Sequence, residues 1–335
     1  MRLIALADMA VEISKAGGLG FIGSGTDTST LSTDLSSASA LLSNSHLHKY
    51  TDVLPIGIGF INWGASLSTA LPLISRYRPA AVWFFAPSSL TSLQDWTTQT
   101  RKASPRTKIW IQIGSVREAI SVVQSVRPDV LIVQGTDAGG HGLVQGASLM
   151  SLLPEVDDAV SQLCEKENIC RPALIGAGGI IDSRGASAAL TLGAHGTVLG
   201  TRLLASPEAN ISKGYREEVL RATDGGQSTV RTKVYDMLRG TTGWAETHNG
   251  RGLINRSYVD AVSGMSDEEN KRLYEEEIKK GDAGWGVEAR MTTYAGSGVG
   301  LVREVKRAGD IVREVREGTK QLLKRWSSEA RAGKL

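Results

Sequence analysis

Short apolar runs rich in valine and isoleucine alternate along the chain with stretches whose apolar residues share one helical face. This alternation predicts βαβ units and a parallel sheet that is buried on both sides. We expect seven strands, at Leu19 to Gly23, Val53 to Phe60, Ala80 to Phe85, Lys108 to Ile113, Val130 to Gln134, Ala173 to Gly176 and Thr197 to Gly200.

Helical patterns fill the gaps between these strands. Ser115 and Glu118 have the spacing of a capping box ahead of Ala119 to Val126, and Ser183 stands before the similar run Ala186 to Leu192. A third helix is predicted because the spacing of Leu31, Leu35, Ala38 and Leu42 would place these apolar residues on one helical face.

Regular alternation over about 200 residues favours a (β/α)₈, or TIM, barrel over a doubly wound sheet. A dinucleotide-binding doubly wound sheet should carry G-x-G-x-x-G in its first βα turn, whereas the nearest segment, Gly23 to Thr28, lacks the third glycine. The first strand of a barrel is missing from the pattern. Leu3 to Lys15 has helical spacing instead, so we expect the chain to begin at the first helix.

The pattern changes after the seventh run. Residues 223–300 are rich in Gly, Trp and Arg and contain one polar helix, which a capping box at Ser266 and Glu269 introduces. We expect a barrel over residues 1–222, an insertion over the barrel mouth at 223–300, and a C-terminal segment, 301–335, whose helix runs from Leu301 to Arg325 and packs on the barrel.

Composition narrows the class of protein. The 335 residues include 38 Lys and Arg and 35 Asp and Glu, and the two signs of charge are interspersed along the chain. We therefore expect no nucleic-acid partner. The two cysteines, Cys164 and Cys170, are too few for a disulfide framework, and closely spaced metal ligands are absent, so we expect no metal and a cytoplasmic location. No apolar run has the length of a membrane span. The ending Gly-Lys-Leu differs by one residue from a peroxisomal address, which is the alternative location.

A phosphate cradle is predicted after the sixth and seventh strands. Gly178 and Gly179 follow a strand directly, and Gly200 and Thr201 end the next one. Glycine turns let backbone N–H groups approach an anion, and barrels often bind phosphate with the loops after their last two strands. The same glycines would also suit tight βα turns that bind nothing.

The candidate base is His141, at the end of a strand in the run QGTDAGGHG. Imidazole near neutral pH can accept a proton from a carbon acid, and the C-terminal face of a barrel carries its chemistry. Two further residues near strand ends, Asn62 and Gln112, have amides that could bind a flat ring or cap a loop. Of the other histidines, we interpret His46, His48 and His195 as structural or solvated, and leave His248 open between substrate contact and surface loop.

Four runs resemble the nitronate monooxygenases, formerly called 2-nitropropane dioxygenases: AGGLGFIG, QGTDAGGHG, IGAGGI and GTRLLASPE. TKVYDMLRGTTGW at 232–244 is similar to fungal members, and YAGSGVGLV at 294–302 belongs to the same similarity. The resemblance implies a flavoprotein barrel that holds FMN and oxidises alkyl nitronates or nitroalkanes with dioxygen to a carbonyl compound and nitrite.

The resemblance also implies roles for individual residues. His141 matches the family's catalytic histidine, and Asn62 and Gln112 fall near flavin-contacting positions. The remaining cofactor-binding positions that we expect are Gly135, Ala138, Gly139, Gly178, Gly179, Gly200 and Thr201.

The chain departs from the family at its start, because the first strand with its Pro-Met turn is absent. An unclosed barrel would expose two strand edges unless another segment covers them. Two alternatives therefore stand beside the oxidase: a flavin-dependent enoyl reductase, which shares the GGH and GAGGI patterns, and a flavin-binding homologue that has lost activity.

Overall fold

A curled sheet of parallel strands dominates the computed structural model, which describes residues 1–43, 45, 47 and 52–331. The sheet confirms the seven predicted strands, each within a residue or two of its expected bounds. They are β1 (Phe21–Gly25), β2 (Leu54–Ile61), β3 (Pro79–Phe85), β4 (Lys108–Ile113), β5 (Val130–Gln134), β7 (Ala173–Ala177) and β8 (Gly196–Val198).

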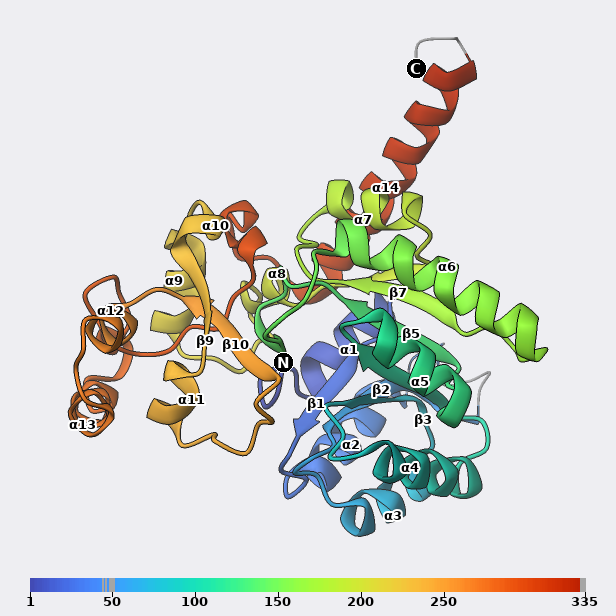
Figure 1. Ribbon diagram of the computed structural model, residues 1–335, viewed down its shortest axis with the longest axis horizontal. Coiled ribbons are helices and arrows are strands. Elements are labelled where there is room, and N and C mark those ends of the chain that lie inside the picture. The colour runs from blue at the N-terminus through green and yellow to red at the C-terminus, as the bar shows by residue number, and fades with distance from the viewer. Residues whose placement is uncertain (44, 46, 48–51, 332–335) are drawn as a thin grey trace.

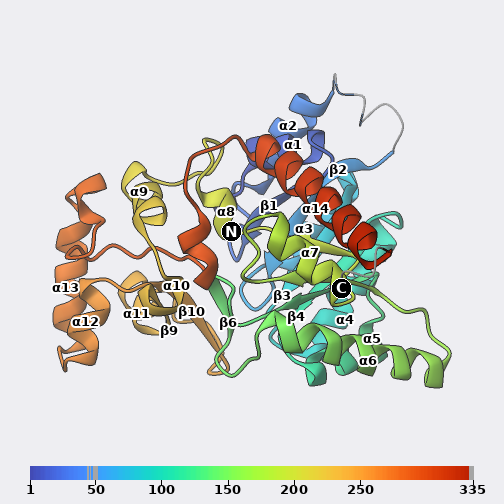
Figure 2. The same ribbon diagram turned by 90° about the horizontal axis from the view of Figure 1, so that it is seen from above.

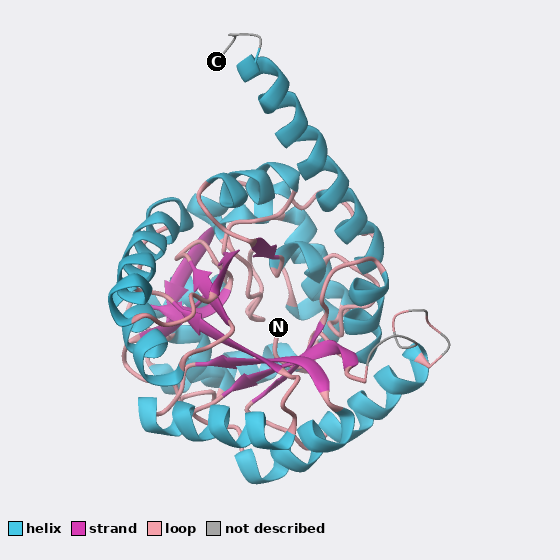
Figure 3. Ribbon diagram, turned by 90° about the vertical axis from the view of Figure 1, so that its right-hand side faces the viewer, coloured by secondary structure: helices cyan, strands magenta, loops and turns pink. Residues whose placement is uncertain are grey.

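The strand order decides between the two folds that the pattern allowed. Every neighbouring pair in the order β1-β2-β3-β4-β5-β7-β8 is parallel. A doubly wound sheet reverses its order at a switch point, whereas this order never reverses. Seen along the barrel, helices ring the strands (Figure 3). The fold is therefore a (β/α) barrel, which the described residues leave open between β8 and β1.

The barrel helices form where the apolar periodicity predicted them. All four residues of the predicted helical face, Leu31 to Leu42, are buried. The Ser115 hydroxyl accepts the Glu118 N–H at 3.2 Å, as the capping box requires. The helices are α1 (Ala7–Lys15), α2 (Leu31–Leu42), α3 (Leu67–Tyr77), α4 (Leu90–Ala103), α5 (Val116–Val126), α6 (Leu149–Glu167), α7 (Ser183–Thr191) and α8 (Thr201–Leu204).

The first turn of the chain lies at the open edge of β1. The Leu3 N–H donates to the Gly23 carbonyl, and the Gly23 N–H donates to the Ala5 carbonyl, both at 2.8 Å. On its other side, Asn210 holds the turn. Its backbone N–H donates to the Ile4 carbonyl at 3.0 Å, and its side-chain amide donates to the Leu3 carbonyl at 2.9 Å. The edge that we expected to be exposed is therefore partly covered.

These bonds correct the prediction for the first helix, which begins at Ala7 and not at Leu3. Leu3 has a φ of 56°, outside the helical region, because its N–H is directed at β1. Helical spacing of apolar residues is a local signal and does not register this long-range pairing.

A second, antiparallel sheet stands beside the barrel mouth. Its order is β6 (Gly140–Leu143), β10 (His248–Leu253) and β9 (Thr229–Thr232), and the apolar pattern did not predict these strands. Figure 1 shows most of segment 223–300 on this side of the barrel. The division of the chain at residues 222 and 300 stays a prediction. The helices of this side are α9 (Lys213–Arg221), α10 (Gly225–Ser228), α11 (Val234–Arg239), α12 (Arg256–Val262), α13 (Asp267–Ile278), η1 (Gly281–Gly284) and η2 (Ser297–Leu301).

The C-terminal helix α14 (Ala308–Arg331) packs against α7 and α1 (Figure 2). Its far end extends past the barrel (Figures 1 and 3). Its predicted start at Leu301 is wrong. The Lys306 N–H donates to the Ala205 carbonyl at 3.1 Å, and the Glu208 carboxylate accepts the Ala308 N–H at 3.0 Å. An acceptor at that N–H caps the helix there.

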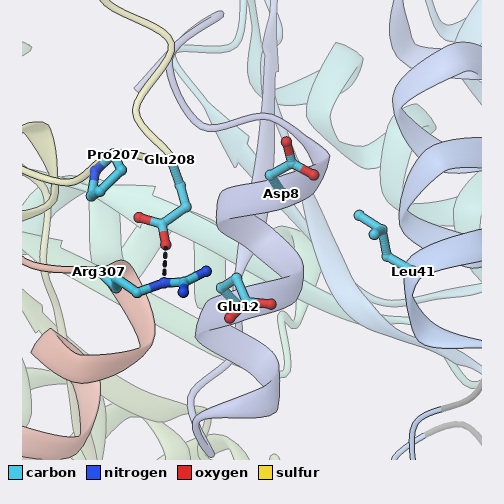
Figure 4. Close-up of a pocket in the computed structure, with 6 residues that line it drawn as sticks. All are labelled: Asp8, Glu12, Leu41, Pro207, Glu208 and Arg307. Atoms are coloured by element: carbon cyan, nitrogen blue, oxygen red, sulfur yellow. Dashed lines mark ion pairs between the residues drawn. The ribbon is translucent and has the colours of Figure 1, made fainter.

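A pocket of about 500 Å³ lies where this cap meets α1 and α2 (Figure 4). The Arg307 Nε stands 3.7 Å from a Glu208 carboxylate oxygen. The pocket contains none of the predicted site residues, so we interpret it as a packing junction. Its lining is Asp8, Glu12, Leu41, Pro207, Glu208 and Arg307.

None of the helices in the described ranges combines the length and the apolar character that crossing a bilayer requires.

Candidate functional site

Seven of the nine predicted cofactor residues follow the carboxyl ends of β5, β7 and β8. The Gly135 N–H donates to the Ala177 carbonyl at 2.9 Å, which joins the loop after β5 to the end of β7. A Cβ added to Gly178 would lie 2.8 Å from the Gly135 carbonyl oxygen and 3.1 Å from the Ala138 nitrogen. The structure therefore brings these loops into contact at the face of the barrel that carries chemistry.

The glycine pair after β7 has the backbone that a cradle needs. Gly178 and Gly179 have φ values of 101° and 74°, which side-chain-bearing residues rarely adopt. Consecutive N–H groups in such a turn form a concave site for an anion. This geometry is compatible with a phosphate group.

Gly200 and Thr201 stand at the end of the neighbouring strand. A Cβ added to Gly200 would meet no atom within 4 Å, so this glycine borders open space. The Thr201 hydroxyl accepts the Gly296 N–H at 2.9 Å. A Cβ on Gly139 would lie 2.5 Å from the Gly296 nitrogen, so the late YAGSG run completes this wall. Sequence reasoning gave that run no role in the site.

Two arginines hold the loop that follows β5. Arg231 donates to the Thr136 and Ala138 carbonyls, each at 3.2 Å, and Arg251 donates to Thr136 at 3.1 Å. Burial, together with the nearby Arg251 guanidinium, lowers the pKa of Arg231 to about 10. The guanidinium still carries its charge at neutral pH, so it pins this loop with charge-assisted hydrogen bonds.

Asn62 and Gln112 lie at other strand ends on the same rim. The Asn62 side-chain oxygen accepts the Phe85 N–H at 3.0 Å, whereas its buried Nδ2 has no hydrogen-bond partner among the described residues. An orphaned donor of this kind suits a bound acceptor. Gln112 accepts the Trp83 indole N–H at 3.1 Å and donates to Gln134. Its hydrogen bonds are therefore with protein groups.

His141 lies on β6, opposite Gly250 of β10, and its side chain is 14% exposed. Its Nε2 stands 2.8 and 3.0 Å from the two carboxylate oxygens of Asp236. The indole of Trp244 stacks on the imidazole, with ring centres 3.8 Å apart and planes 6° apart. The imidazole is thus held by two residues of the segment next to the barrel mouth.

A second pocket, of about 210 Å³, opens beside His141's strand. Its walls come from β3, β4, β5, β6 and the start of β10, and include Phe85, Gln112, Gln134, Leu143 and His248. His248 is therefore a strand residue at a pocket and not part of a free surface loop. Its ring lies 5.6 Å from that of Phe85.

His248 predicts a pH effect on stability. Burial, then the nearby His141 and Arg231, lower its pKa from 6.5 to about 4. The His248 side chain takes up a proton near pH 6.5 in the unfolded chain, but only near pH 4 in the folded chain. The free energy of unfolding therefore falls as the pH drops from about 6.5 to about 4. Between about pH 7 and pH 4.5, we expect the wild type to lose about 1–2 kcal/mol more than His248→Gln, a figure that allows for the partial exposure of the ring. Urea unfolding at both pH values measures the difference, and equal losses would contradict it.

His195 makes a structural contact away from the site. The Leu174 N–H donates to Nδ1 of His195 at 3.2 Å, near the end of the sheet opposite the site. His46 and His48 lie outside the described residues. Among the described residues, no group of three or more His, Cys, Asp and Glu side chains is arranged to hold a metal ion.

Sequence reasoning missed Asp236, Trp244 and Tyr294 as neighbours of His141. The first two lie in the run TKVYDMLRGTTGW and the third begins YAGSGVGLV, which carried the family resemblance but no assigned role. Asp236 is 95 positions from His141 in the chain. A contact over that separation leaves no local pattern.

Comparisons with known proteins agree on one family. A family model described as nitronate monooxygenase matches residues 75–318. Nitronate monooxygenase npaC of Metarhizium robertsii is 46% identical over 328 residues, which are 96% of this chain and 90% of the relative. A nitronate monooxygenase of Neurospora crassa is 35% identical over 345 residues, covering 97% of this chain and 89% of the relative.

Solved structures share the fold. The chain is similar to FabK from Thermotoga maritima with a TM-score of 0.70 and 22% identity, over 98% of this chain and 93% of that one. It is also similar to a nitroalkane oxidase from Streptomyces ansochromogenes with a TM-score of 0.69 and 20% identity, over 95% and 93% of the two chains. At these identities the structures support the barrel architecture alone.

Proposed function

Because the chain belongs to the nitronate monooxygenase family, an oxidoreductase family, we propose that it oxidises alkyl nitronates with dioxygen to a carbonyl compound and nitrite, using FMN. The observation that carries this proposal is the position of His141 at the barrel mouth, next to the loops that bear the glycine cradle. We further propose that neutral nitroalkanes are substrates and that His141 is the base.

The cradle supports FMN as the flavin. Nitronate monooxygenases are flavoproteins in general, and FMN differs from free riboflavin by its phosphate. Gly178, Gly179, Gly200 and Thr201 would hold that phosphate, and the orphaned Asn62 amide would donate to an acceptor on the ring. Gly135, Ala138 and Gly139 would line the same site. The chemistry that bound FMN supplies is electron transfer from the substrate to dioxygen.

The chain's own residues would bind the substrate and move its proton. A nitroalkane is a carbon acid, and imidazole accepts a proton efficiently when its pKa lies near the working pH. Trp244 covers one face of His141 and limits the access of water to it. The pocket of about 210 Å³ beside β6 has room for a small substrate.

The reaction can be tested on the purified full chain. We expect denaturation to release FMN, ethyl nitronate to bleach the flavin without oxygen, and oxygen to yield nitrite. Rapid bleaching by NADH or NADPH, with none by nitronate, would contradict the proposal and favour an enoyl reductase. A chain that binds FMN but is reduced by neither donor would be a homologue without this activity.

For the location in the cell, we propose the cytoplasm, on composition alone. The peroxisomal alternative depends on Gly-Lys-Leu at 333–335, which lies outside the described residues. Imaging of the chain tagged at its N-terminus, so that the C-terminus stays free, distinguishes the two.

A further inference from the structure

A buried carboxylate faces the imidazole of His141. The side chains of His141 and Asp236 are 14% and 7% exposed, and Nε2 contacts both carboxylate oxygens within 3.0 Å. Asp236 belongs to α11 and His141 to β6, so the contact joins the segment beside the mouth to the strand that carries the candidate base.

The carboxylate is held by two other donors. The Thr241 hydroxyl donates to Oδ1 at 2.8 Å, and the Tyr294 hydroxyl donates to the same oxygen at 3.3 Å. Burial and the Asp236 charge raise the pKa of Tyr294 well above its usual range, so the phenol keeps its proton and donates it in this bond. Three donors therefore converge on one buried acceptor.

This convergence selects one tautomer of His141. An ionised carboxylate only accepts hydrogen bonds, so Nε2 carries the proton. Nδ1 then keeps its lone pair, and no described residue hydrogen-bonds to it. The nitrogen left free is the one that can accept a proton from a substrate.

The plane of the ring is fixed as well. Trp244 stacks on it at 3.8 Å, and the Tyr294 ring lies 5.4 Å away on a tilted plane. Charged and titratable groups near the pair include His248 on β10, Arg231 on β9, and Arg239, whose guanidinium carbon lies 5.6 Å from the centre of the Tyr294 ring. Asp236 is the only carboxylate among these neighbours of the imidazole in the described structure.

Resting on the proposed function, we propose that Asp236 is the positioning residue of the base: it holds His141 as the Nε2–H tautomer and stabilises the imidazolium that forms when Nδ1 takes the substrate's proton. In that step the C–H bond of the nitroalkane breaks and its electron pair stays on the resulting nitronate. The proton moves to Nδ1, so no other reactant is needed. Asp236 itself accepts no proton. An aspartate that fixes the tautomer of a histidine base has this role in serine proteases.

Asp236→Asn tests the proposal with little change in volume. We expect turnover of a neutral nitroalkane to fall by about 10² or more, because the amide can donate to Nε2 and favour the wrong tautomer. KM should change little, and oxidation of preformed ethyl nitronate should stay within about threefold, since that substrate has already lost its proton. Equal losses for both substrates would overturn the proposal.

Asp260→Asn is the matched control. Asp260 is also a buried aspartate on this side of the barrel, 7% exposed, and pairs with Arg290 and Arg256. Its loss should lower stability but leave the ratio of the two activities unchanged. A changed ratio in this variant would assign the effect to general loosening and overturn the role of Asp236.

A second measurement does not depend on turnover. We expect ¹⁵N NMR of labelled imidazole to show the Nε2–H tautomer for His141 in the wild type and a shift toward Nδ1–H in Asp236→Asn. An unchanged tautomer would overturn the proposal even if activity fell. If the wild type oxidises no nitronate, the proposed function fails, and the tautomer still decides the role of Asp236.

Discussion

His141→Asn should lose turnover of neutral nitroalkanes by about 10²–10⁴ while it retains its flavin. Asparagine fills a similar space but cannot accept a proton at neutral pH, so a carbon acid stays protonated. A preformed nitronate has no proton to lose and should react at a rate within about tenfold of wild type. Initial rates with nitroethane and with ethyl nitronate measure the two effects.

The matched control for this variant is His195→Asn. The His195 imidazole accepts the backbone N–H of Leu174 near the opposite end of the sheet, away from the site. Its loss should leave the ratio of the two rates unchanged. If His141→Asn lost both activities equally, His141 would act on the nitronate itself and not as the base.

Gly200→Asp should strongly weaken flavin binding without unfolding the chain. A Cβ at this position meets no atom within 4 Å, and its φ of −115° is not in the left-handed region that favours glycine, so the fold accepts the side chain. The added carboxylate would point toward the proposed phosphate and repel it. We expect the affinity for FMN to fall at least about a hundredfold, which corresponds to about 2.8 kcal/mol. Titration of the flavin-free protein with FMN, followed by fluorescence, measures it.

Two control variants show whether Gly200→Asp acts through the charge of its carboxylate at this position. Gly200→Ala adds only a methyl group and should retain much of the affinity. Gly146→Asp places the same carboxylate on an exposed loop glycine, whose added Cβ meets only ordinary contacts at 3.8 Å or more, and should bind as the wild type does. Normal FMN affinity in Gly200→Asp would place the phosphate elsewhere.

The barrel could be predicted because its signals are local. Strands buried on both faces need continuous apolar runs, and helices that cover them need apolar residues on one face. The seven strands and α2 follow these rules closely. The glycine cradle was visible for a similar reason, because a turn with positive φ favours glycine whatever surrounds it.

The predicted starts of two helices were wrong because hydrogen bonds to distant residues set where each helix begins. α1 begins late because Leu3 and Ala5 bond to Gly23 of β1, and α14 begins late because Glu208 caps it at Ala308. In both cases the local helical pattern begins before the true start of the helix, which a long-range hydrogen bond sets.

By itself, the sequence determined the seven parallel strands, the glycine turns after β7 and β8, and the histidine at the mouth, because each depends on residues that are neighbours in the chain. Only the tertiary structure decided what surrounds that histidine. It placed Asp236 against Nε2, Trp244 on the ring face and Arg231 on the loop before it, all from segments about a hundred positions away. Chain folding brings such groups together without any spacing rule, and their geometry is what prepares an imidazole to act as a base.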